Sequence, residues 1–127
     1  MSDSCMVCFQ SEACDLEGAI KSLESYRFSV VRKDEELIVN RGDGLQFKVI
    51  LSNADHVQEE ANEIAEGSEF SSEMSKCNAR FEIIIENLDA ALNEINTLME
   101  VQGALQDASK GYLFLPWNGK ISGPWVG

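Results

Sequence analysis

The chain has 127 residues, of which 44% are hydrophobic and 25% are charged, and its net charge is −12. This length and composition predict a single domain, residues 1–127, that can bury an ordinary core without disulfide or metal staples. The excess of acidic residues disfavours binding to nucleic acid, which depends on neutralising phosphates with Lys and Arg, and disfavours anionic membranes. It suits a basic protein partner.

No apolar run approaches the length of a membrane span, and the N-terminus lacks the basic start and long apolar stretch of a secretory signal. We therefore expect a cytoplasmic protein. The first ten residues show no clear period and are left as a candidate disordered extension. A first helix is predicted over 12–25, with Ser11 as N-cap, from a stripe of apolar residues at helical spacing: Leu16, Ala19, Ile20 and Leu23.

From Tyr26 the hydrophobic period changes to two, which predicts three strands at 26–31, 37–39 and 45–51. Short connections between consecutive strands imply an antiparallel meander. The last connection contains Arg41-Gly42-Asp43, which spells the integrin-binding tripeptide but serves better to mark a hairpin turn.

A second helix is predicted over 53–66, with Ser52 and Asp55 spaced like a capping box. After a polar loop at 68–78, a strand at 79–86 carries apolar residues on both faces and is expected to be central. The longest periodic stretch, 87–110, predicts one amphipathic helix with a core-facing stripe formed by Leu88, Ala91, Leu92, Ile95, Leu98, Met99 and Leu105.

A strand at 112–115 and an Asn118-Gly119 hairpin signal follow the long helix. The predicted order is α-β-β-β-α-β-α-β. It indicates an α+β two-layer sandwich, with a mostly antiparallel or mixed sheet of about five strands and helices on one face.

Cysteines are the first candidates for chemistry. Cys5, Cys8 and Cys14 follow the spacing C-x2-C-x5-C, and Cys77 stands alone, with His56 as the other candidate for a fourth ligand. Zinc sites commonly need two such pairs, so we expect no metal and no other cofactor. A redox pair is an alternative, but such a pair usually follows a strand, and none is predicted here. Reduced structural thiols are the favoured interpretation.

No other residue pattern predicts catalysis, and we assign no catalytic residue. His56, the single histidine, lies in an acidic helix and is interpreted as a surface residue. Glu82 and Glu86 share one strand face, which is typical of a solvated sheet surface. No phosphate-binding or hydrolase motif occurs in the chain, which argues against a nucleotide enzyme.

Charge is distributed unevenly along the chain. Between residues 52 and 86 only Lys76 and Arg80 oppose nine acids: Asp55, Glu59, Glu60, Glu63, Glu66, Glu69, Glu73, Glu82 and Glu86. This predicts a negative patch centred on the second helix. The C-terminal stretch is aromatic instead, and it predicts either closure of the core or a contact surface, through Tyr112, Phe114, Trp117 and Trp125.

The leading hypothesis is a non-enzymatic protein-binding domain, similar in size and charge to immunity-type inhibitors of basic partners. Its candidate partner-binding residues are Asp55, Glu59, Glu60, Glu63, Glu66, Tyr112, Trp117 and Trp125. One alternative is an enzyme with a small-molecule or metal site between the sheet and the helices. The other is a structural subunit that forms homo-oligomers, such as a homodimer.

Overall fold

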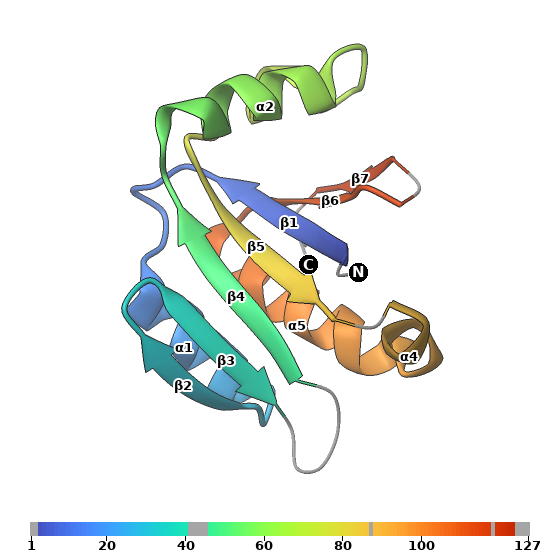
Figure 1. Cartoon of the computed structure of the whole chain (residues 1–127). Coiled ribbons are helices and arrows are strands. Elements are labelled where there is room, and N and C mark those ends of the chain that lie inside the picture. The colour runs from blue at the N-terminus through green and yellow to red at the C-terminus, as the bar shows by residue number, and fades with distance from the viewer. Residues whose placement is uncertain (1–2, 41–45, 87, 118, 124–127) are drawn as a thin grey trace.

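In the computed structural model, residues 3–40, 46–86, 88–117 and 119–123 are described, and they form an α+β fold. Its elements are β1 (Asp3–Phe9), α1 (Leu16–Ser25), β2 (Ser29–Lys33), β3 (Glu36–Asn40), β4 (Gln46–Ser52), α2 (Asp55–Ala65), α3 (Ser71–Met74), β5 (Ala79–Ile85), α4 (Leu88–Asn93), α5 (Ile95–Ser109), β6 (Tyr112–Leu115) and β7 (Lys120–Ser122). The strands form one antiparallel sheet in the order β2-β3-β4-β5-β1-β6-β7 (Figure 1). The predicted class is confirmed, with seven strands rather than about five.

The N-terminal segment is the largest departure from the sequence prediction. Instead of a disordered extension, it forms β1, which lies between β5 and β6 near the middle of the sheet. Asp3 pairs with Ile85 and Phe9 with Ala79. Side chains on both faces of β1 are covered, which explains why its sequence is a nearly continuous apolar run rather than an alternating one.

The predicted meander is present as β2, β3 and β4, which are neighbours in the sheet. β2 begins at Ser29 rather than at Tyr26, because Tyr26 forms the C-cap of α1 and Arg27 adopts a φ of 70°. The Arg41-Gly42-Asp43 turn lies outside the described residues. The strand predicted to be central, β5, lies between β4 and β1, so its position is confirmed.

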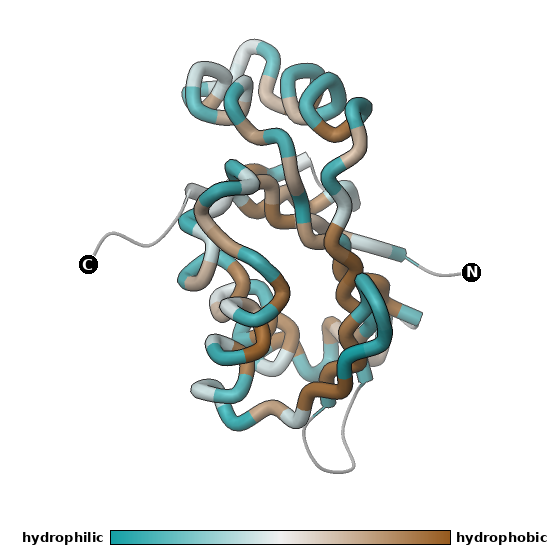
Figure 2. Tube along the Cα trace, turned by 90° about the vertical axis from the view of Figure 1, so that its left-hand side faces the viewer, coloured by the Kyte–Doolittle hydropathy of each residue, from teal (hydrophilic) through white to brown (hydrophobic). Residues whose placement is uncertain are grey.

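The main core lies between the sheet and the layer formed by α1 and α5 (Figure 2). Leu23 of α1 and Leu105 of α5 are fully buried against strand residues such as Phe81, whose ring stacks on Phe9 at 4.8 Å. The first helix begins at Leu16 and not at residue 12. Its cap is Asp15 rather than Ser11, and the Asp15 carboxylate accepts a hydrogen bond from the Gly18 N–H at 2.9 Å.

The helix predicted over 87–110 is divided at Glu94 into α4 and α5. Glu94 leaves the helical region, with φ −115° and ψ 49°. Within the predicted stripe, Ala91, Leu98 and Leu105 are buried, whereas three other members are exposed: Leu92, Ile95 and Met99. The prediction was therefore correct for helical structure and wrong for half of the face, because the sheet and α1 cover a narrower arc than the apolar residues occupy.

The last two strands form the predicted hairpin. Leu113 pairs with Ser122, and the Gly119 N–H donates to the Leu115 carbonyl oxygen at 2.8 Å. Gly119 has a φ of 71°, which glycine adopts without steric cost.

Candidate functional site: the α2 and α3 cap

Helix α2 packs on the face of the sheet opposite to α1 and α5, across one end of the strands (Figure 1). The prediction that the helices share one face is therefore wrong for α2. Val57, Ala61 and Ala65 recur every four residues and are fully buried. The two alanines contact a second, smaller core around Cys8, and their small side chains let the helix approach the sheet closely.

The capping box predicted from Ser52 and Asp55 does not form. The N-cap of α2 is Ala54, and no side chain caps the helix there. The last turn of α2 contains no basic residue, although a cation at this position would interact favourably with the helix dipole. The helix is consequently held in place by its contacts with the sheet rather than by its own ends.

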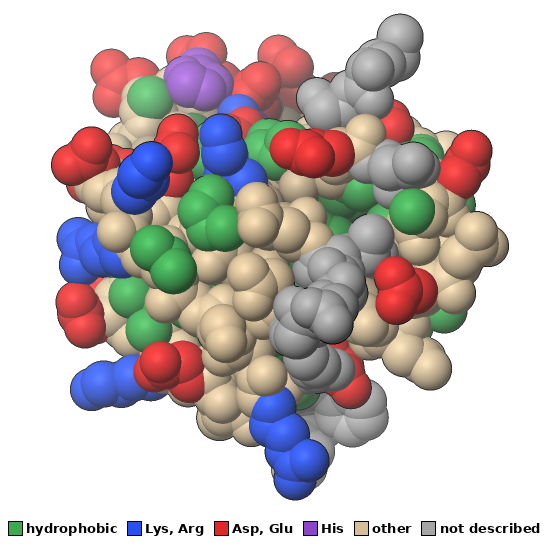
Figure 3. Space-filling model, turned by 60° about the horizontal axis from the view of Figure 1, so that its bottom comes forward, with side chains coloured by type: hydrophobic (Ala, Val, Ile, Leu, Met, Phe, Trp, Pro, Cys, Tyr) green, Lys and Arg blue, Asp and Glu red, His purple; other side chains and the backbone are tan. Residues whose placement is uncertain are grey.

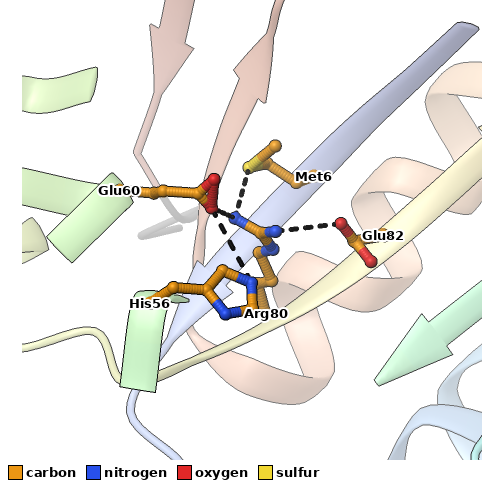
Figure 4. A network of polar contacts seen from close by, with 5 residues as sticks. All are labelled: Met6, His56, Glu60, Arg80 and Glu82. Atoms are coloured by element: carbon orange, nitrogen blue, oxygen red, sulfur yellow. Dashed lines mark hydrogen bonds and ion pairs between the residues drawn. The ribbon is translucent and has the colours of Figure 1, made fainter. Parts of the chain in front are cut away.

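Arg80 of β5 connects α2 to the sheet (Figure 4). Its side chain is 8% exposed, and Nη1 lies 2.7 Å from Oε2 of Glu60 on α2. Its Nη2 lies 3.0 Å from Oε1 of Glu82 on the same strand, and Met6 Sδ is 3.9 Å from Nη1. His56 adds a longer contact of 3.9 Å from Nε2 to Glu60. Because a buried guanidinium must be paired, the Glu60 carboxylate fixes α2 over β5, and Glu82 holds the guanidinium from its own strand.

This network decides which acids remain available to a partner. Glu60 is half-exposed and shares the Arg80 guanidinium with Glu82, so its charge is compensated in part. The remaining acids of α2 are exposed, and at 100° per residue they lie on the helix side opposite Val57, Ala61 and Ala65. We define the acidic cap as these three residues of α2 with the three exposed acids that follow the helix: Asp55, Glu59, Glu63, Glu66, Glu69 and Glu73. Figure 3 shows carboxylates gathered along the top of the molecule.

The aromatic candidates mainly pack inside the fold. Tyr112 is half-buried in the second core, with its ring 5.5 Å from that of Phe70 at 56°. Trp117 is half-buried against the main core. Trp125 lies outside the described residues. The structure thus brings Tyr112 close to the base of the cap through Phe70, but it displays little of this aromatic surface.

Three of the four cysteines, Cys5, Cys8 and Cys77, are buried, and Cys14 is half-buried. Cys5 and Cys8 point to opposite faces of β1, since Cys5 belongs to the main core and Cys8 to the second core. Burial raises the pKa of Cys5 to about 11, that of Cys8 to about 12 and that of Cys77 to about 11. These thiols therefore stay protonated at neutral pH, which is unfavourable for redox exchange. Within the described residues, no group of three or more His, Cys, Asp and Glu side chains is arranged to hold a metal ion.

A pocket of about 370 Å³ opens beside the cap, at the end of the sheet rather than between the sheet and α1 and α5. Phe9, Cys77 and Tyr112 line it, with Lys76 and Lys110 among the other side chains. Because the raised pKa keeps the Cys77 thiol protonated, Cys77 is a poor nucleophile.

Comparisons of the chain with protein-family models, with curated proteins and with solved structures gave no match. None of the described helices is both long enough and apolar enough to cross a membrane. The case for a function consequently rests on the geometry and charge of the chain itself.

Proposed function

We propose that this protein is a non-enzymatic binding domain that docks a basic protein partner through the acidic cap, in the manner of an immunity-type inhibitor. One observation carries the proposal. Arg80, a base close to the centre of this surface, is buried and paired with Glu60 and Glu82. The acids of the acidic cap therefore face solvent and are not paired with Arg80.

Such a surface acts first on the rate of association. Carboxylates gathered on one face attract a basic protein over roughly a Debye length, about 8–10 Å at physiological salt. Electrostatic steering of this kind raises association rates by roughly 10- to 1,000-fold and falls steeply with ionic strength. It also orients the partner toward α2.

The test is affinity capture from the native host, followed by kinetic measurements with the captured protein. We expect that protein to be basic, and its association rate to fall steeply between about 0.05 and 0.3 M salt. Glu59→Lys combined with Glu63→Lys should slow association at least about tenfold, because both reversals lie on the exposed stripe of α2 and leave the Glu60–Arg80 pair intact.

The matched control is Glu24→Lys combined with Glu35→Lys, which changes the net charge equally at exposed positions on α1 and in the β2–β3 turn. It should slow association much less. An equal effect of both pairs would show that only net charge matters, and an unchanged rate after the α2 reversals would refute the role of the cap.

A further inference from the structure

A second surface of the protein has an unusual distribution of apolar and polar side chains. Among the described residues, the large hydrophobic side chains that are exposed include Leu92 at 42%, Ile95 at 41% and Met99 at 57%. These three lie within eight residues, on α4 and the first turns of α5. Figure 1 places this region at the opposite end of the sheet from α2.

One flank of α5 reverses the usual pattern of burial along its length. Ile95, Met99, Gln102 and Gln106 recur at intervals of four, three and four and so share this flank. The two amides are buried at 5% and 6% exposure, whereas the two apolar side chains are in solvent. Solubility alone would favour the opposite arrangement.

The polar half of the flank is buried because other elements cover it. The Gln102 amide lies 3.5 Å from Cys5 Sγ of β1. The Gln106 amide donates to the carbonyl oxygens of Ser122 and Gly123, each at 3.2 Å, at the end of the β6–β7 hairpin. This cover does not reach the first turns of α5. Ile95 and Met99 therefore continue this covered flank into solvent, and we call them, together with the exposed Leu92 of α4, the α4–α5 stripe.

The charges around the α4–α5 stripe are acidic. Asp89 and Glu94 are exposed on the same elements, and the sequence contains no Lys or Arg between residues 81 and 109. On one side of α5, Arg27 lines a recess together with Glu100. An apolar strip beside exposed carboxylates has the complementary charge for an apolar strip beside Lys and Arg.

We propose that the α4–α5 stripe docks an amphipathic helix of a protein partner, one whose apolar face is flanked by Lys and Arg. Ile95 and Met99 lie one turn apart on one flank of α5, and Leu92 precedes them near the end of α4, so the three exposed side chains offer apolar contact area to a second helix. A second copy of this chain would bring carboxylates against carboxylates between molecules that each carry a charge of −12. Anionic membranes would be repelled for the same reason. The surface is separate from the acidic cap, and the inference does not depend on the function proposed above.

The experiment uses the full chain and a synthetic peptide of about 18 residues, helical by design, with Leu on one face and Lys on both flanks. Binding is followed by fluorescence anisotropy in about 0.15 M salt. Ile95→Gln combined with Met99→Gln should weaken binding at least tenfold without loss of the fold, because both side chains are exposed. Val31→Gln removes an equally exposed hydrophobic residue on β2 and should change the affinity less than about twofold.

Two further measurements distinguish binding at the α4–α5 stripe from binding at the acidic cap and from purely hydrophobic association. Glu59→Lys combined with Glu63→Lys should leave peptide affinity within about threefold, so failure of the cap proposal and failure of this one are distinguishable. The same peptide with Glu in place of Lys should bind at least tenfold more weakly.

Several outcomes would overturn the inference. These are a Kd weaker than about 100 µM for the wild-type chain, equal binding by the Gln variant, and equal binding of the Glu-flanked peptide. Retention on anionic vesicles that the Gln variant loses would identify a lipid surface as the occupant. A dimer in sedimentation that the Gln variant loses would identify a second copy.

Discussion

Two glycines, Gly103 in the interior of α5 and Gly111 just after the helix, differ in what their neighbours permit. At Gly111, an added Cβ would lie 2.6 Å from Val7 Cγ1 and 2.8 Å from the Cys8 carbonyl oxygen, because β6 starts directly beside β1. At Gly103, the nearest atom to an added Cβ is Tyr26 Oη at 3.9 Å, an ordinary contact. Among the described residues, no neighbour approaches Gly103 closely enough to require glycine there.

We therefore expect opposite effects from the same substitution at these two positions. Gly111→Ala should lower the free energy of unfolding by about 2 kcal/mol or more, because a backbone oxygen cannot move aside. Gly103→Ala should raise it by roughly 0.5–1 kcal/mol, since alanine restricts the unfolded chain and favours the helix. Thermal or urea unfolding of both variants measures this, and equal destabilisation by both would contradict the geometry around Gly103.

At the scale of elements, the position of α2 depends on few contacts. The helix lacks a side-chain cap, and its buried side is small, formed by Val57, Ala61 and Ala65. The Glu60–Arg80 pair is thus a large part of what holds it against β5. We therefore expect α2 to detach from β5 in a local opening that leaves the main core folded.

Arg80→Ala tests the role of this pair. We expect a loss of about 2 kcal/mol in the free energy of unfolding, less than for a fully buried pair, because Glu60 and Glu82 keep access to water. Hydrogen exchange should show amides of α2 losing protection while those of α1 stay protected. Glu24→Ala, at an exposed position on α1, is the control. Equal loss of protection in α1 and α2 would mean that Arg80 supports the whole fold rather than α2.

Elements with a clear local pattern could be predicted from the sequence, whereas their partners in space could not. The meander, the central position of β5 and the β6–β7 hairpin follow from alternation and turn residues. The strand β1 was not predicted, because the spacing of Cys5 and Cys8 also fits a metal-ligand pair and the segment lacks alternation of apolar and polar residues. The continuous run Cys5–Phe9 was nevertheless a signal for a strand covered on both faces. The side of the sheet on which α2 packs depends on tertiary contacts, which local pattern does not contain.

The candidate site was predictable in charge but not in detail. The acidic stripe of α2 follows from helical spacing alone. The pairing of Glu60 with Arg80 joins residues 20 positions apart across two elements, so no local signal could have identified it. Likewise, periodicity placed Leu92, Ile95 and Met99 in the core. It reports which residues are apolar and not how wide an arc the neighbouring elements cover.

At the scale of the whole molecule, the charge of −12 is a cost to stability concentrated in the acidic cap. Asp55, Glu59 and Glu63 follow one another at intervals of four, which places like charges side by side on the helix. Glu63 also lies in the last turns of α2, where a negative charge opposes the helix dipole. Local stability alone would therefore not favour this arrangement.

Glu63→Lys should consequently stabilise the protein while weakening its proposed association with a basic partner. We expect a gain of roughly 0.5–1 kcal/mol in the free energy of unfolding at low salt, from a new pair with Glu59 and a favourable dipole contact. Glu35→Lys changes the net charge equally outside a helix and should gain less. Unfolding measured at about 0.02 and 0.5 M salt should show the Glu63→Lys gain shrinking as charges are screened. A loss of stability at low salt would mean that Glu63 has a structural role. The acids of α2 would then be explained by stability, and they would no longer support a role in binding.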